Sequence, residues 1–266
     1  MVAETIPLSF AGATSVARLR EMTGRDERAI LGAGTVDAIQ LLDALLDNSL
    51  THRGERLCAA DLVTADRDRL LAAVYERAFG DRIESTLGCA RCAQPFEMCF
   101  SLSELIKSIL KPRSVDGWRH LGDGRYETAT GVPFRLPTGN DELAVASLSS
   151  KEAELSLLSY CAESDAWPGG ANAFEEMLNE VAPLLAFELK ATCPECGHTH
   201  MLKFDIQSYL LDAIVGERRR LLAEIHRLAT AYAWSLGEIL SLTRSDRRQF
   251  VKLIEDETSR KAHFLQ

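Results

Sequence analysis

The sequence predicts an α+β fold: an internally duplicated, helix-rich domain with two short cysteine-bearing β-hairpins and further helices at the C-terminus. Three observations point to this fold. Two C-x-x-C pairs each lie between strand-like segments. A T-G-x-D-E pattern occurs twice, each time before an apolar helical segment. Beyond the second cysteine pair, apolar residues recur every three or four positions, which is the helical period.

Composition limits the possible classes of protein. The chain has 266 residues, 46% of them hydrophobic and 26% charged, so it can form one large or two small domains with a buried core. Its net charge of −9 disfavours phosphate backbones and anionic lipids as partners. No apolar run approaches the roughly 18 residues of a membrane helix, and the N-terminus lacks the pattern of a signal peptide. We therefore expect a cytoplasmic, reducing location with no membrane segment, where cysteines act as thiols or metal ligands.

The first half of the chain opens with a strand-like stretch at Ile6–Leu8 and the first T-G-x-D-E pattern at Thr23–Glu27. A threonine N-cap followed by acidic residues satisfies free amides and suits the helix dipole, so we interpret the pattern as helix capping. Paired catalytic carboxylates at Asp26 and Glu27 are an alternative that lacks an evident acid–base partner. An apolar helix is expected at Ile39–Leu46.

The first cysteine pair, Cys89 and Cys92, is expected on the turn of a hairpin. Strand-like residues lead in at Ile83–Leu87 and lead out at Phe96–Phe100. A helical segment, Ser101–Leu110, follows. This half of the chain is therefore expected to end near residue 112.

The second half repeats this order after a linker at residues 113–131, which are rich in glycine and turn residues and are expected to contain a hairpin. A strand is expected at Val132–Phe134, followed by the second T-G-x-D-E pattern at Thr138–Glu142. For this pattern too we prefer capping to a pair of catalytic carboxylates at Asp141 and Glu142. An apolar helix at Leu155–Cys161 comes next.

The second cysteine pair lies in T-C-P-E-C-G-H, which is a zinc-knuckle sequence. Two thiolates three residues apart on a tight turn can face one ion, and the glycine that follows permits a positive φ. One hairpin supplies two ligands, whereas a structural zinc needs four, so the simplest site is a zinc-ribbon-like centre with one Zn²⁺ shared by both hairpins. The predicted ligands are Cys89, Cys92, Cys193 and Cys196. His198 and His200 are the possible substitutes.

Other chemistries fit the cysteine pairs less well. A thioredoxin-like redox pair opens a helix in a βαβ unit, whereas both pairs here lie between strands. A zinc deaminase needs an H-x-E motif, which the sequence lacks. Four thiolates leave no coordination position for water, so the zinc would be structural. Since the sequence also lacks a P-loop, G-x-S-x-G and H-E-x-x-H, we expect neither an enzyme nor a small-molecule substrate.

The two halves match in order and in spacing. The T-G-x-D-E patterns are 115 residues apart and the cysteine pairs are 104 residues apart. Phe100 and Phe204 each lie 11 residues after the first cysteine of their pair. Three matches in the same order predict duplicated units at residues 1–112 and 132–206. A shared zinc would cross-link these units.

Residues 207–266 are expected to form C-terminal helices. The apolar period that begins at Ile206 continues past a gap at Glu217. Ser235 then begins a capping box with Glu238, and Ser245 is expected to cap a last helix.

These last helices also resemble a helix-turn-helix layout. Four cations cluster there: Arg244, Arg247, Arg248 and Lys252. A zinc-ribbon, helix-turn-helix regulator that binds nucleic acid is therefore an alternative reading. Such a cluster is more often a solvated or protein-binding face, and the chain is acidic overall.

Three segments taken together resemble a known family. They are D-R-D-R-L-L-A-A-V at 66–74, C-P-E-C-G-H at 193–198 and the helical run at 221–248. The ordered set is similar to T-even-phage-like baseplate hub proteins and hub-assembly chaperones of tailed phages and contractile injection systems. The resemblance is strongest over 187–254.

The resemblance implies a non-enzymatic structural or assembly (chaperone) protein of a baseplate hub. Its partners would be other hub, spike or tube proteins, and it would be cytoplasmic or incorporated in a phage-like particle. From the residues themselves, contacts to partners are expected from helix faces and from Trp118, Trp167 and Trp234. The alternatives are loop packing for Trp167 and a core position for Trp234. The first knuckle departs from the family pattern, with Ala90 in place of the usual proline and Ala93 in place of glycine, which puts its turn geometry in question.

Overall fold

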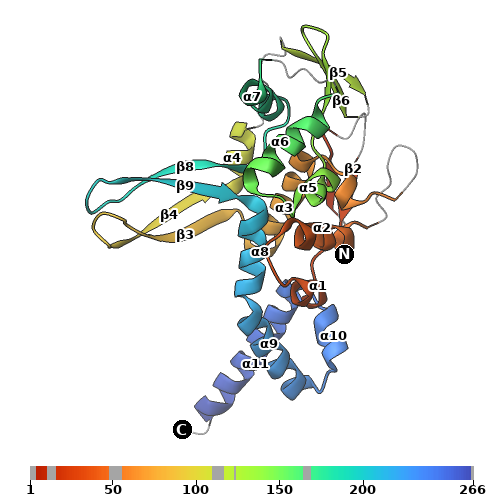
Figure 1. The fold of residues 1–266 in the computed structure, drawn as a ribbon. Coiled ribbons are helices and arrows are strands. Elements are labelled where there is room, and N and C mark those ends of the chain that lie inside the picture. The colour runs from red at the N-terminus through yellow and green to blue at the C-terminus, as the bar shows by residue number, and fades with distance from the viewer. Residues whose placement is uncertain are drawn as a thin grey trace.

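The computed structural model describes residues 4–10, 16–47, 56–109, 117–122, 124–163 and 169–264, with side chains up to residue 260. The paired strands of these residues form four small antiparallel sheets of two or three strands, β1–β2, β3–β4, β5–β6–β7 and β8–β9. The described chain is therefore α+β, as the sequence predicted. The elements in chain order (Figure 1) are β1 (Glu4–Pro7), β2 (Val16–Leu19), α1 (Gly24–Ala29), α2 (Thr35–Leu45), the 3₁₀ turn η1 (Ala59–Asp61), α3 (Thr64–Phe79), β3 (Arg82–Gly88), β4 (Pro95–Ser101), α4 (Leu102–Ile109), β5 (Trp118–Gly122), β6 (Arg125–Thr128), β7 (Pro133–Arg135), α5 (Gly139–Val145), α6 (Ser150–Cys161), α7 (Ala171–Val181), β8 (Ala186–Thr192), β9 (Thr199–Asp205), α8 (Ile206–Gly216), α9 (Arg218–Tyr232), α10 (Leu236–Ser241) and α11 (Arg244–Phe264).

The described residues form three buried apolar clusters, of which the smallest lies between the hairpin turns around Phe96 and Ala191 and the other two form the body. The larger joins α2 and α3 to α8 through side chains such as Leu42, Leu71 and Leu210. The smaller joins β6 and β7 to α6 and α7 around Phe134 and Phe174. Because the larger cluster contains residues from both ends of the sequence, α8 folds against the N-terminal helices. No helix within the described ranges combines the length and apolarity needed to cross a membrane.

Two long hairpins project side by side from this body (Figure 1). In β3–β4 the register begins with Arg82 opposite Ser101, and in β8–β9 it begins with Ala186 opposite Asp205. The bounds of β8 and β9 and the start of α8 each lie 104 residues after those of β3, β4 and α4. The hairpins are therefore matched residue by residue, including the helix that follows each.

Both T-G-x-D-E patterns start short helices, α1 and α5, and both are capping boxes. The caps have nearly the same backbone angles, with φ −107° and ψ 169° at Thr23 and φ −114° and ψ 169° at Thr138. In each, the cap's N–H and hydroxyl donate 2.8 Å hydrogen bonds to the aspartate three residues later. That aspartate also accepts two 2.7 Å hydrogen bonds from Arg20 in the first half or Arg135 in the second. The capping interpretation is confirmed.

These hydrogen bonds decide the charge of the two capping aspartates. Burial alone would raise the pKa of Asp26 and Asp141. The donors from arginine and threonine outweigh burial, so the pKa of each lies below its usual value. Both side chains are therefore ionised at neutral pH and hydrogen-bonded to the threonine and the arginine.

The strand before each cap differs from expectation. We expected Ile6–Leu8 to correspond to Val132–Phe134. In the structure, each cap has an arginine three residues before it. Arg20 directly follows β2 in the first half, and Arg135 is the last residue of β7 in the second. The counterpart of β7 is therefore β2, and Ile6 lies in the strand that pairs with it. A stretch of three strand-like residues was too short to distinguish these neighbouring strands.

Helix α1 is fastened to the start of α11, a contact we call the α1 joint. Gly24 donates its N–H to the carbonyl of Leu242 at 3.1 Å. Glu27 and Arg247, 3% and 1% exposed, form an ion pair at 2.7 Å. A Cβ on Gly24 would lie 2.8 Å from the guanidinium of Arg247, so a larger residue here would force the ion-paired arginine to shift.

Helix α5 is fastened to the start of α3 in the same way, in the α5 joint. Gly139 donates its N–H to the carbonyl of Leu62 at 3.1 Å. Glu142 and the buried Arg67 form an ion pair at 2.7 Å. A Cβ on Gly139 would lie 3.0 Å from the carbonyl oxygen of Ala60. The two joints thus use the same atoms at corresponding positions.

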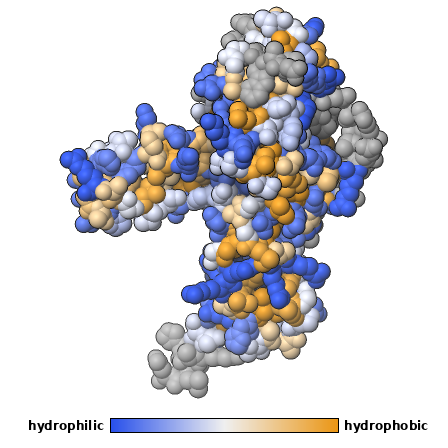
Figure 2. Space-filling model, viewed as in Figure 1, coloured by the Kyte–Doolittle hydropathy of each residue, from blue (hydrophilic) through white to orange (hydrophobic). Residues whose placement is uncertain are grey.

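The C-terminal helices follow the predicted breaks with one correction. Helices α8 and α9 meet at Glu217, and Ser235 forms the predicted capping box with Glu238. Helix α11 is capped by Thr243, whose hydroxyl accepts from the N–H of Asp246, and not by Ser245. Figure 2 shows apolar and hydrophilic residues side by side on the lobe that these helices form.

The correction has a simple physical reason. An acidic residue three positions after the cap completes a capping box. Thr243 has Asp246 at that position, and the two side chains are hydrogen-bonded at 2.8 Å. Ser245 has a cation, Arg248, at the corresponding position.

We expect Asp68 to make the stability of the protein depend on pH. Asp68 is 3% exposed and accepts a 2.9 Å hydrogen bond from the N–H of Leu185. Burial raises its pKa to about 7. An unfolded aspartate has a pKa of about 3.9, so the folded state binds more protons at neutral pH. The contribution of Asp68 is therefore full below about pH 4 and is lost as the pH rises through about 7.

The substitution Asp68→Asn tests this expectation, because asparagine keeps an oxygen that can accept from Leu185. The free energy of unfolding of the variant should gain about 2 to 3 kcal/mol relative to wild type between pH 5 and pH 8. Urea unfolding of both proteins at the two pH values measures this gain. A difference that does not change with pH would show that Asp68 is ionised in the folded state.

Candidate metal centre

The four predicted cysteines come together at the turns of the two hairpins. Their Sγ atoms, from Cys89, Cys92, Cys193 and Cys196, all lie within 4.8 Å of one another. The sulfur of Cys89 is 3.6 Å from that of Cys196, and that of Cys92 is 3.7 Å from that of Cys193. Tetrahedral zinc with Zn–S bonds of about 2.3 Å sets sulfurs about 3.8 Å apart, whereas a disulfide bond is about 2.0 Å. The spacing therefore fits a closed tetrahedral metal site formed by free thiols.

The backbone presents each cysteine pair in the same way. In both turns, the first cysteine donates its N–H to the carbonyl five residues later and accepts from the N–H four residues later, all at 2.9 Å. The residue after the second cysteine has a positive φ, 59° at Ala93 and 69° at Gly197. The turn geometry that Ala93 put in question is therefore kept, at the cost of a left-handed alanine.

This left-handed alanine leads to a paired prediction. An L-residue in the left-handed region costs roughly 1 kcal/mol, which glycine avoids. The substitution Ala93→Gly should therefore raise the free energy of unfolding by about 0.5 to 1 kcal/mol, and Gly197→Ala should lower it by a similar amount. Denaturant unfolding of the two variants and wild type measures both changes. Changes of the same sign would contradict the assignment.

Equivalent positions of the two hairpins face each other across the site. The rings of Phe100 and Phe204 lie 5.3 Å apart, and those of Phe96 and His200 lie 5.4 Å apart. In each of these pairs the two residues are 104 positions apart in the sequence. Contacts between a residue and its own counterpart are typical of a twofold arrangement. The hairpins are therefore related by a local twofold axis that passes near the sulfur cluster.

The charges of the cluster also fit a cation. Burial alone would raise the pKa of Cys89, but hydrogen bonds from the N–H groups of Cys92 and Arg91 and from His200 lower it to about 5. The N–H of Gln94 lowers the pKa of Cys92, but burial and the three neighbouring sulfurs raise it to about 12. One thiolate at this site thus opposes the ionisation of Cys92. A dication among the sulfurs would remove that repulsion.

The two histidines lie beside the sulfur cluster. His200 places its Nε2 3.4 Å from the sulfur of Cys89, and its ring lies 4.8 Å from that of His198. Within the described residues, the group of mutually close ligand atoms contains the four sulfurs and neither histidine. The geometry thus gives His200 the position of a hydrogen-bond donor to a ligand.

The predicted aromatic contacts are largely occupied within the chain. Trp118 lies against Tyr126, and Trp234 stacks with Tyr232 and meets Phe250 edge-on. Both tryptophans are half-buried. Trp167 lies outside the described residues.

The basic cluster of α11 faces partly inwards. Arg247 is 1% exposed and Arg244 is 6% exposed, and both form ion pairs with Glu27. Both guanidinium groups are therefore held in ion pairs within the fold, and Arg247 is enclosed by protein. Sequence reasoning missed their role, although L-x-x-x-D-R recurs at 62–67 and 242–247, where the two joints form.

The comparison with known protein families gives one match. A family model described as T4 bacteriophage base plate protein matches residues 5–164. No curated protein and no solved structure gives a significant match. The family match includes 66–74 and the first knuckle but ends before 187–254, where we placed the strongest resemblance. Because it covers more than half of the chain, this protein belongs to the family of T4 bacteriophage base plate proteins.

Proposed function

We propose that this chain is a non-enzymatic structural or assembly protein of the baseplate hub in a phage tail or contractile injection system, with one structural Zn²⁺. Membership of the baseplate family supports the setting. The observation that carries the metal is the set of four sulfurs within 4.8 Å, contributed in pairs by two hairpins. Its partners would be other hub, spike or tube proteins.

The zinc would act as a cross-link between the hairpins. Cys89, Cys92, Cys193 and Cys196 would hold it as thiolates, and the ion would supply the charge that lets all four ionise. His200 would donate to the sulfur of Cys89 and help to fix its orientation. Four protein ligands leave no position for water, which is consistent with a structural role.

We also propose that residues 1–112 and 132–206 derive from one duplicated unit, with 113–131 as the connection and 207–266 as an added helical segment. The equal hairpin bounds and the twin capping boxes support this proposal. So does the local twofold axis, because duplicated units pair in this way.

The proposed function is tested by following the chain through tail assembly. Cells that produce complete particles are compared with cells that lack this gene, and purified baseplates are analysed by quantitative mass spectrometry. A fixed copy number in finished baseplates would identify a subunit, whereas absence from them together with failed assembly in the deletion would identify a chaperone. Normal baseplates that never contain the chain would contradict both roles.

The nucleic-acid alternative gains no specific support, since two of its four cations are buried in ion pairs. Retention on heparin at low salt offers a direct test. Tight retention that salt abolishes would favour the regulator over the baseplate protein.

A further inference from the structure

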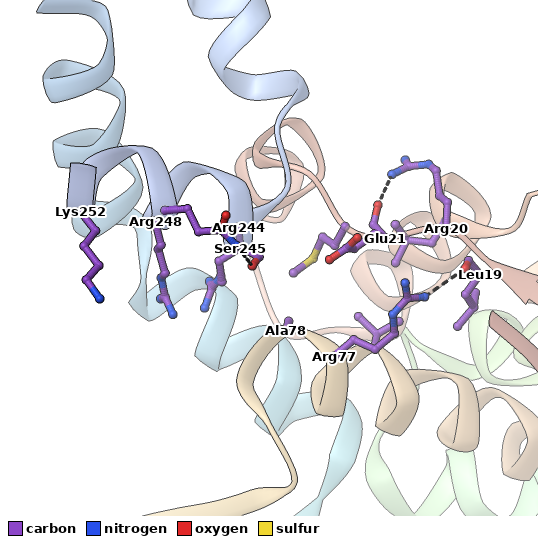
Figure 3. Close-up of a pocket in the computed structure, with 13 residues that line it drawn as sticks. Leu19, Arg20, Glu21, Arg77, Ala78, Arg244, Ser245, Arg248 and Lys252 are labelled. Carbon is purple, nitrogen blue, oxygen red and sulfur yellow. Dashed lines mark hydrogen bonds between the residues drawn. The ribbon is translucent and has the colours of Figure 1, made fainter. Parts of the chain in front are cut away.

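A basic pocket lies between α3, the end of β2 and α11 (Figure 3), on residues that neither the joints nor the hairpins explain fully. Its cavity volume is about 370 Å³. Arg77, Arg244, Arg248 and Lys252 line it, together with a single acidic side chain, Glu21. A cavity so rich in cations is unexpected in a chain with a net charge of −9.

Three of these cations form one stripe on α11. Arg244, Arg248 and Lys252 are spaced by four residues, which places them on one face of the helix. Figure 3 shows the three side chains extended in parallel from successive turns. The stripe therefore presents three positive groups in the same direction.

The buried end of the stripe has unused donors. Arg244 is 6% exposed, yet its Nε and Nη1 have no hydrogen-bond partner among the described residues. The nearest carboxylate to Nη1 is that of Glu217, at 3.8 Å, which is beyond hydrogen-bond distance. The Nε of Arg248 likewise makes no hydrogen bond, although it lies 3.6 Å from the carboxylate of Glu224. Buried guanidinium donors without acceptors are costly. These atoms have almost no accessible surface, so an acceptor that enters the pocket would first meet the exposed parts of Arg248 and Lys252.

The charges around the stripe are unbalanced. One connected ion-pair network joins three carboxylates, Glu27, Glu217 and Glu224, to four guanidinium groups. The four guanidinium groups belong to Arg220, Arg244, Arg247 and Arg248. The described network is thus one negative charge short, and Lys252 beside it adds a further positive charge. One incoming anion would balance the network.

The rest of the lining favours a carboxylate carried by a protein. Leu19, Met22, Leu45 and Val74 give the cavity an apolar floor. A hydrated phosphate gains nothing from such a surface, whereas an acidic side chain flanked by apolar residues does. The negative charge of the whole chain repels a polyanion such as DNA. The choice of a protein as the partner rests on the proposed baseplate function.

We propose that this pocket binds the carboxylate of an acidic side chain, flanked by apolar residues, on a protein partner of the baseplate. Arg248 and Lys252 would hold the carboxylate in the pocket, and the buried Arg244 behind them would add its positive charge. The proposal does not depend on zinc, so it can fail or succeed independently of the metal site.

A blocked leucine–glutamate–leucine peptide is the probe, and the same peptide with glutamine in place of glutamate is its control. Binding is followed through the Nε–Hε NMR signals of Arg244 and Arg248 in the full chain. We expect saturable shifts with the glutamate peptide only. Lys252→Gln, at an exposed position, should weaken binding of the glutamate peptide. The double variant Arg248→Gln with Lys252→Gln should weaken it by at least about tenfold, because a charge-assisted hydrogen bond is lost. Lys151→Gln, which removes an exposed lysine on α6, should change nothing.

Three results would overturn the proposal. The first is the absence of saturable shifts, and the second is equal binding of the glutamine peptide. The third is competition in which inorganic phosphate or a DNA duplex displaces the peptide at lower concentration, which would make the pocket a phosphate site. Lys252 is exposed, so its variant tests the pocket without affecting the fold.

Discussion

Replacement of Cys193 by serine is expected to remove bound zinc and most of the stability of the protein. The wild-type chain should contain one zinc ion. A structural zinc site contributes on the order of 10 kcal/mol of apparent binding free energy, which is comparable to the whole stability of an ordinary domain. Cys193 is fully buried where the hairpins meet. If serine binds the metal poorly at this position, water cannot enter to take its place as a ligand. Elemental analysis and thermal unfolding measure the two losses.

Cys99→Ser is the matched control, since Cys99 is an exposed thiol on β4, in the same hairpin as Cys89. It should keep its zinc and unfold at the wild-type temperature. A strong chelator should reproduce the effect of Cys193→Ser on the wild-type protein. If the protein as purified holds no metal, or if both serine variants unfold alike, the zinc site is wrong.

The second large effect is expected at the α1 joint. Replacing Arg247 by methionine keeps an unbranched side chain but removes the guanidinium group, which leaves Glu27 and Glu224 buried without this partner. Breaking a buried ion pair on one side costs about 3 to 5 kcal/mol, because a charge remains in a poorly solvated place. The free energy of unfolding in urea should fall by that amount.

Arg219→Met is the control for this prediction, because Arg219 is exposed on α9. Its cost should stay within about 0.5 kcal/mol. Combining Arg247→Met with Glu27→Gln should recover part of the loss, since the buried carboxylate is then removed. Equal costs for Arg247→Met and Arg219→Met would show that the joint contributes little to stability.

The sequence predicted well those features that depend only on residues close together in the chain. The knuckle turns need two cysteines and a positive φ within six residues, and the helix caps need a threonine and an acid three residues apart. The α+β class also follows from local periods. The expectation that both turns share one site came from the four ligands that a closed zinc centre needs, and the four sulfurs do lie together.

The joints could not be found in the same way. Glu27 and Arg247 are far apart in the sequence, and neither segment contains a pattern that indicates which residue the other pairs with. Charged runs such as D-R-D-R at 66–69 normally face solvent, whereas Asp66, Arg67 and Asp68 are buried here. The role of glycine in T-G-x-D-E is visible only when the neighbouring chain is in place. The basic pocket likewise exists only after α3 and α11 are brought together.

The α1 joint has a consequence for how the chain is made. The α5 joint links residues 62 and 139, so it can close as soon as the first half of the polypeptide has emerged during synthesis. The partner of Gly24 is Leu242, near the C-terminus, so α1 has to wait for almost the whole chain to be translated. Until then the acid of the first T-G-x-D-E segment stays hydrated instead of paired. The N-terminal helix therefore reaches its final place last, and a prematurely terminated product would leave that helix unanchored.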